Sequence, residues 1–104
     1  MKVLFNVVTP QGKQIRTTEQ YWHEITTYKH PQLAGHLSQV ELVLVDPDKI
    51  RKSRSDEHVY LYYRRVKSGI LCVVVRHLNG EGFVVTAYST EKEKEGITIW
   101  QKTR

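Results

Sequence analysis

The sequence predicts an α+β fold, in which two helices from the N-terminal half pack on one face of an antiparallel β-sheet and a further β-hairpin precedes them. Residues 60–65, 72–76 and 82–90 are rich in β-branched and aromatic side chains and are separated by short segments that contain glycine, which predicts three consecutive strands. Residues 3–8 and 13–17 flank a Pro-Gln-Gly turn, which favours the N-terminal hairpin.

The two helices are predicted from their capping residues and from the spacing of apolar side chains. Thr17 and Gln20 match a capping box, in which the hydroxyl and the amide satisfy backbone N–H groups at the start of a helix. Apolar residues then recur at helical spacing until Pro31, which ends the helix. A second helix is expected to begin within residues 33–35 and to stop at residues 46–48, whose proline opens a further helical turn.

The C-terminal half combines charged connections with the predicted strands. A charge-dense loop at residues 51–58 leads into the strands, and residues 79–82 form the clearest turn between them. Residues 91–96 mix charge signs at short spacing, so we expect a solvated turn or a short helix there. Residues 97–100 predict a last short strand, and sheet edges there or at residues 3–8 offer a route to a homodimer.

Composition sets the broad class of the protein. The chain has 104 residues with 39% hydrophobic content, which predicts one domain over residues 1–104 with one packed core. The net charge of +5 indicates an anionic partner such as RNA, although many small soluble domains are mildly basic. Cys72 is the only cysteine and lies in an apolar run, so we expect a buried, inert thiol and no internal disulfide. These features, with no membrane-length apolar stretch and no signal-peptide pattern, predict a cytoplasmic location away from any membrane.

Alternation of side chains along the strands separates two faces of the sheet. Apolar residues such as Leu61, Val85 and Ala87 share one parity of their strands and are expected to face the helices. The opposite face then collects hydroxyl and guanidinium groups: Tyr62, Arg64, Arg76, Thr86, Tyr88 and Thr90. The alternative is an ordinary solvated strand face, because Tyr and Thr are good strand formers.

The chemistry that fits such a face is metal-independent cleavage of RNA. The ribose 2′-hydroxyl attacks the adjacent phosphorus, which requires a base, an acid for the leaving 5′-oxygen and cations for the developing charge. Arginine is always protonated and can bind two phosphate oxygens, and histidine titrates near neutral pH.

His30 is the preferred catalytic histidine, because it lies at a predicted helix end where the chain turns back toward the sheet. The alternative is a structural histidine before a proline. His30 and His36 could share a metal, but no second ligand cluster accompanies them, so we expect no metal and no cofactor. In the basic loop, Arg51 and Arg54 are either phosphate ligands beside the open face or solvated side chains.

Three segments together resemble a known group of proteins. They are the Lys-His-Pro at residues 29–31, the run at residues 46–56, and residues 82–90 with the Lys-Glu-Gly at 94–96. They resemble small prokaryotic proteins of the barnase–EndoU–colicin–RelE-like nuclease superfamily, often encoded by phages and by mobile or toxin–antitoxin loci. The likeness runs from about residue 22 to residue 100 and leaves the N-terminal hairpin outside.

The resemblance implies a single RelE/barnase-like domain, with a helical part packed on an antiparallel sheet of about four strands and the active surface on the open face. By position, the site residues it implies are His30, Arg54, Tyr62, Arg64, Arg76, Tyr88 and Thr90. One departure from the group is that no glutamate falls on this face, so His30 or a tyrosine would have to serve as the base.

We therefore expect an endoribonuclease. One form consistent with the resemblance is the toxin of a toxin–antitoxin pair, whose partner would be a protein antitoxin. Its catalytic residues would be His30, Arg64, Arg76 and Tyr88, and its RNA-binding residues Arg51, Arg54, Tyr62, Thr86 and Thr90. The alternative is a non-catalytic module that binds nucleic acid or a protein through the same basic, aromatic face.

Overall fold

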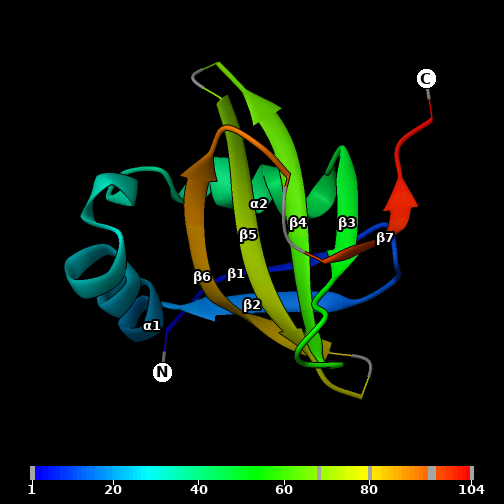
Figure 1. Ribbon diagram of the computed structural model, residues 1–104. Helices are drawn as coiled ribbons and strands as arrows, with labels where there is room; N and C mark the ends of the chain where they lie inside the picture. The colour runs from blue at the N-terminus through cyan, green and yellow to red at the C-terminus, as the bar shows by residue number, and fades with distance from the viewer. Residues whose placement is uncertain (1, 68, 80, 94–95, 104) are drawn as a thin grey trace.

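Seven strands in one sheet dominate the computed structural model, which describes residues 2–67, 69–79, 81–93 and 96–103 (Figure 1). The chain order is β1 (Val3–Val8), β2 (Gln14–Thr18), α1 (Glu19–Glu24), η1 (Ile25–Lys29), η2 (Pro31–Leu33), α2 (Leu37–Val45), β3 (Lys49–Lys52), β4 (Val59–Val66), β5 (Gly69–His77), β6 (Glu81–Thr90) and β7 (Ile97–Gln101).

The sheet is mixed, and its spatial order is β1-β2-β6-β5-β4-β3-β7. Neighbouring strands are antiparallel except β2 and β6, which pair in parallel between residues 14–16 and 81–83. The prediction of a purely antiparallel sheet of about four strands, with a separate hairpin, is therefore wrong. The predicted hairpin exists as β1 and β2, but the parallel pairing with β6 makes it part of the main sheet. The free sheet edges lie at β1 and β7, as the sequence predicts.

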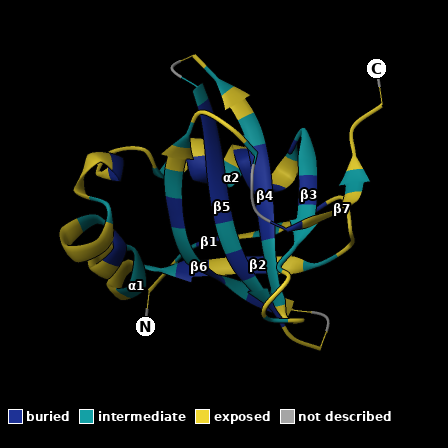
Figure 2. Ribbon diagram, viewed as in Figure 1, coloured by how far each residue is buried: buried dark blue, intermediate teal, exposed yellow. Residues whose placement is uncertain are grey.

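The main core lies between the sheet and α2. In Figure 1, α2 and the β1–β2 hairpin lie behind β4, β5 and β6. Val40, Val43 and Leu44 of α2 are fully buried in this core, together with Tyr62 and Val73 from the central strands. The buried stretches of β4 and β5 stand out along the centre of the sheet in Figure 2. Apolar burial on this face is the main source of the stability of the fold.

The first helix begins one residue later than the capping pattern predicts. Thr18, not Thr17, is the N-cap, and its hydroxyl accepts a hydrogen bond of 3.2 Å from the Tyr21 N–H. Thr17 instead belongs to β2 and is buried. The helix continues as the π-helical turn η1, which ends at His30 with a 2.7 Å bond from its N–H to the Ile25 carbonyl. Pro31 disfavours a helical backbone at the residue before it, which explains why the turn ends at His30.

The second helix ends where the sequence predicts, but it begins later and is followed by a strand. Its first residue is Leu37, and Asp46 is its C-cap. The predicted helical turn after Pro47 is wrong, because residues 49–52 pair with β4 as strand β3. The three predicted strands and the last short strand are confirmed as β4, β5, β6 and β7. The predicted turn at residues 79–82 and the segment at residues 91–96 fall partly outside the described residues.

The other face of the sheet, which we call the open face, carries a smaller apolar cluster. Leu61, Tyr63, Ile70 and Cys72 are buried there, with Val74 and Tyr88 packed against them. Glu93, which follows β6, lies over the β3 side of this face, since its carboxylate pairs with Lys49 at 3.0 Å. The open face is therefore partly covered although α2 lies on the opposite side of the sheet.

Within the described part of the chain, every helix falls short of the length and apolar character that a membrane crossing requires.

Candidate nucleic-acid interface

Pairing between strands arranges the open face in three rows of side chains. Residues paired across antiparallel strands point to the same side, so each row can be followed from one strand to the next. The first row contains Lys49, Tyr63, Cys72 and Tyr88; the second contains Arg51, Leu61, Val74 and Thr86; the third contains Val59, Arg76 and Phe83. Successive rows are about 6.6 Å apart, because they are separated by two residues of a strand.

His30 lies at the end of the first row. Its ring centroid is 6.1 Å from that of Tyr88, and the two ring planes are tilted by 37°. The preceding residue, Lys29, donates a 3.3 Å hydrogen bond from Nζ to the carbonyl of Val85, which ties η1 to β6. The imidazole is half-buried beside the open face. His30 and Tyr88, which the sequence assigned together to the site, therefore lie side by side.

Tyr88 is held in a cluster of hydroxyl and thiol groups. Burial raises the pKa of Tyr88 well above its ordinary value. The side chains of Cys72 and Tyr63, to which Tyr88 is hydrogen-bonded, raise this pKa further. A phenol with a raised pKa stays protonated at neutral pH, so it donates hydrogen bonds and does not serve as a base. Of the two base candidates that the sequence left open, this environment favours His30 over Tyr88.

The second row contains two buried polar atoms without a partner among the described residues. They are Nε of Arg51 and Oγ1 of Thr86. A buried polar group that stays unpaired costs free energy, so such atoms call for an explanation and can mark where a ligand binds. Both belong to residues that the sequence assigned to RNA binding.

Arg76 lies in the third row and is paired with an acidic residue. Its Nη1 is 3.0 Å from Oδ2 of Asp56, in the turn between β3 and β4 that also contains the exposed Arg54. A backbone hydrogen bond from His58, and then the bond from Arg76, lower the pKa of Asp56. A guanidinium has five N–H donors, so this one contact leaves capacity for a phosphate.

Arg76 lies two rows away from Tyr88, the residue beside His30. Cys72 pairs with Tyr88, and Arg76 is four residues further along β5, about 13 Å away at the rise of a strand. This spacing along the backbone favours contact of Arg76 with a phosphate next to the one at His30. Two of the residues assigned to catalysis from the sequence, Tyr88 and Arg76, therefore lie on the open face in different rows.

Two predicted site residues lie on the opposite side of the sheet. Tyr62 is fully buried in the main core, where its hydroxyl is 3.1 Å from both Thr9 Oγ1 and His77 Nε2. Arg64 donates from Nη1 to the carbonyl of Asp46 at 2.6 Å and to its carboxylate at 2.9 Å. Their placement on the open face was wrong, because the even-numbered residues of β4 face α2.

The remaining predicted residue, Thr90, caps the end of β6. Its hydroxyl donates a 2.9 Å hydrogen bond to the Lys92 carbonyl and accepts one of 3.3 Å from the Lys92 N–H. These bonds give Thr90 a local role in the turn. Sequence reasoning did not assign Tyr63 and Cys72, the neighbours of Tyr88, to the site. Both lie in apolar segments and were expected to be core residues. The buried cluster to which they belong lies on the open face.

Among the described residues, no group of three or more His, Cys, Asp or Glu side chains is arranged to hold a metal ion.

Comparisons with known proteins give no family for the chain. A scan of family models finds no match, and searches of curated proteins and of solved structures find none either.

Proposed function

We propose that the protein is a metal-independent endoribonuclease that cleaves single-stranded RNA on the open face of its sheet. The observation that carries the proposal is the placement of His30 against Tyr88, at the end of a face that also carries Arg51, Thr86 and Arg76. These five residues come from four separate segments of the chain. The resemblance of the Lys-His-Pro and of residues 82–90 to the barnase–EndoU–colicin–RelE-like superfamily supports the same reaction.

The proposed reaction is an internal transfer of the phosphate. His30 accepts the proton of the 2′-hydroxyl, the 2′-oxygen forms a bond to phosphorus, and the bond from phosphorus to the 5′-oxygen breaks. Tyr88, protonated at neutral pH, donates a hydrogen bond toward the phosphate or the leaving oxygen. The leaving 5′-oxygen takes up a proton from water as it departs, and His30 later returns its proton to water. The products are a 2′,3′-cyclic phosphate and a 5′-hydroxyl.

Arg51, Thr86 and Arg76 bind the RNA on either side of the reacting bond in this proposal. Arg51 and Thr86 present buried polar atoms without partners among the described residues, and Arg76 presents a half-exposed guanidinium. In this arrangement the RNA chain crosses the three rows from His30 toward Arg76. Electrostatic attraction of the +5 chain for phosphates adds to these contacts.

The experiment that tests the proposal incubates the purified protein with single-stranded RNA in EDTA. We expect cleavage with 2′,3′-cyclic phosphate ends, and no cleavage of the same sequence as DNA, which lacks the 2′-hydroxyl. Salt-sensitive RNA binding without any cleavage would contradict the proposal and would identify a binding module.

A matched pair of arginines tests the position of the RNA. Arg76 and Arg64 are both half-buried and each is paired with one aspartate, but they lie on opposite sides of the sheet. Arg76→Gln is expected to weaken RNA binding about tenfold or more, since hydrogen bonds to charged groups are worth about 1.5–3 kcal/mol. Arg64→Gln should leave binding unchanged. Equal losses in the two variants would show that RNA does not select the open face.

A further inference from the structure

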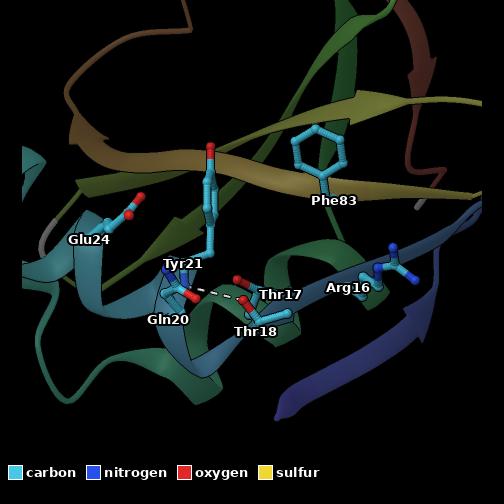
Figure 3. A pocket seen from close by; sticks show the side chains of 7 residues that line it. All are labelled: Arg16, Thr17, Thr18, Gln20, Tyr21, Glu24 and Phe83. Atoms are coloured by element: carbon cyan, nitrogen blue, oxygen red, sulfur yellow. Dashed lines mark hydrogen bonds between the residues drawn. The ribbon is translucent and has the colours of Figure 1, made fainter. Parts of the chain in front are cut away.

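A pocket of about 330 Å³ lies beside the third row, between the start of α1 and strand β6. Figure 3 shows the rings of Tyr21 and Phe83 standing on either side of it, with Thr17 and Thr18 at its base. The ring centroids are 6.2 Å apart and the ring planes are nearly perpendicular, at 87°. Its volume is near the lower end of the range for small-molecule sites.

The pocket combines aromatic surface with flanking cations. Phe83 pairs with Arg16 of β2 on one side and with Arg76 of β5 on the other, so a guanidinium-bearing residue lies on each side of its ring. Lys29 Nζ is 5.6 Å from the centroid of the Tyr21 ring. Aromatic faces with adjacent cations are the features by which proteins hold unpaired nucleotides, because bases stack on the rings and phosphates pair with the cations.

The floor of the pocket contains an unexplained polar group. Thr17 is only 2% exposed, and its Oγ1 has no hydrogen-bond partner among the described residues. A hydroxyl can donate or accept, so it can pair with a polar atom on the edge of a base. Glu24 on the rim adds a carboxylate that can accept from an amino group of the base.

We infer that this pocket binds one unpaired nucleobase of the RNA, stacked on Phe83 or Tyr21, two rows away from His30. The inference rests on the proposed function and deepens it by adding a base-binding subsite. The pocket adjoins Phe83 in the third row, whereas His30 adjoins Tyr88 in the first, about 13 Å along the strands. The bound base therefore belongs to a nucleotide that neighbours the cleaved bond without flanking it directly.

The test measures binding without cleavage, so that it is separate from catalysis. The probe is a fluorescent single-stranded RNA with 2′-O-methyl groups throughout, which has no attacking hydroxyl, and binding is followed by fluorescence anisotropy. Phe83→Leu keeps apolar bulk but removes the stacking ring, and it is expected to weaken binding at least about fivefold. Phe83→Tyr keeps the ring and should bind like the parent. Thermal unfolding of each variant verifies that it is folded.

A control elsewhere on the surface and an abasic probe make the result specific. Tyr28→Leu removes a 79% exposed ring outside the pocket and should not change binding. A series of probes, each lacking one base, should reveal a position whose loss weakens binding to the parent but not to Phe83→Leu. The inference is overturned if Phe83→Leu binds normally, if Tyr28→Leu loses as much, or if every abasic effect persists in Phe83→Leu. Base-dependent binding of a protein that cleaves no RNA would refute only the proposed reaction.

Discussion

At the scale of single residues, the aromatic hydroxyls of β4 and β6 have different tasks. Tyr88 lies on the open face beside His30, whereas Tyr62 lies in the main core and is bonded to Thr9 and His77. The Tyr60 ring stacks on the same His77 at 4.0 Å, with an 18° angle between the rings. This polar network joins the β1–β2 turn to the central strands, so its role is structural.

Removing the buried hydroxyl of Tyr62 should therefore affect stability and leave RNA cleavage unchanged. Tyr62→Phe leaves Thr9 and His77 without this partner and is expected to lower the free energy of unfolding by about 1–3 kcal/mol. Urea unfolding measures this change, and Tyr28→Phe at an exposed ring serves as the control. Loss of cleavage without loss of stability would show that Tyr62 has a functional role after all.

Acid should destabilise the protein through His77. Burial, with a smaller effect from Lys13, lowers the pKa of His77 to about 4 from its ordinary 6.5. Between these values the unfolded chain binds more protons than the folded chain, so stability falls as pH falls from about 6.5 toward 4. The loss attributed to this group is at most about 3 kcal/mol.

Urea unfolding between pH 7 and 4 measures this dependence. His77→Gln removes the titrating group, and the pH dependence in this window should become flatter than in the parent. An unchanged slope in the variant would assign the acid sensitivity to other groups, such as the carboxylates of Asp46 and Asp56, whose pKa values are also lowered.

At the scale of the elements, a close backbone contact at Gly96 positions the C-terminal strand β7 against β3. Gly96 has a φ of 85° and lies directly before β7. A Cβ added there would be 2.6 Å from the Lys52 carbonyl oxygen and 3.1 Å from the Arg51 Cβ. Glycine is required at this position both for the left-handed backbone and for the close approach to β3.

A pair of glycine substitutions separates these two requirements. Gly35 has nearly the same φ, 84°, but a Cβ there would meet nothing within 4 Å. Gly35→Ala should cost only the backbone strain, about 1–2 kcal/mol, whereas Gly96→Ala should cost clearly more because β7 must move from β3. Chemical unfolding of both variants measures the difference. Equal losses would mean that the contact with Lys52 is relaxed without cost.

Sequence reasoning identified the strands but could not assign all of their faces. Arg76, Thr86 and Tyr88 share the open face as alternation predicts. On β4 the rule failed, because Tyr62 and Tyr63 are both buried, on opposite faces, so neither parity marks the solvent side.

A bulge also limits what alternation can predict on β6. The pairing shifts between Val74 and Val75, so that Val84 and Ala87 both face the main core while Phe83 lies on the open face. A bulge inserts one extra residue and reverses the parity beyond it. The aromatic pocket was missed for this reason.

At the scale of the whole molecule, the parallel pairing of β2 with β6 extends the open face beyond β6. This pairing sets Arg16 beside Phe83 and carries the start of α1 to the pocket. The contact between residues far apart in the chain cannot be read from local patterns. It extends the surface from His30 to Arg16, and the +5 charge of the chain favours polyanion binding along it.

The rate of RNA cleavage in EDTA by the parent, His30→Ala and His23→Ala tests the central claim most directly. His23 is a control, since it is an exposed histidine on α1 in the same part of the chain. We predict that His30→Ala lowers the rate by about 10²–10⁴-fold, the usual contribution of a general base, while His23→Ala cleaves like the parent. Full activity in a folded His30→Ala variant would contradict the placement of catalysis at His30.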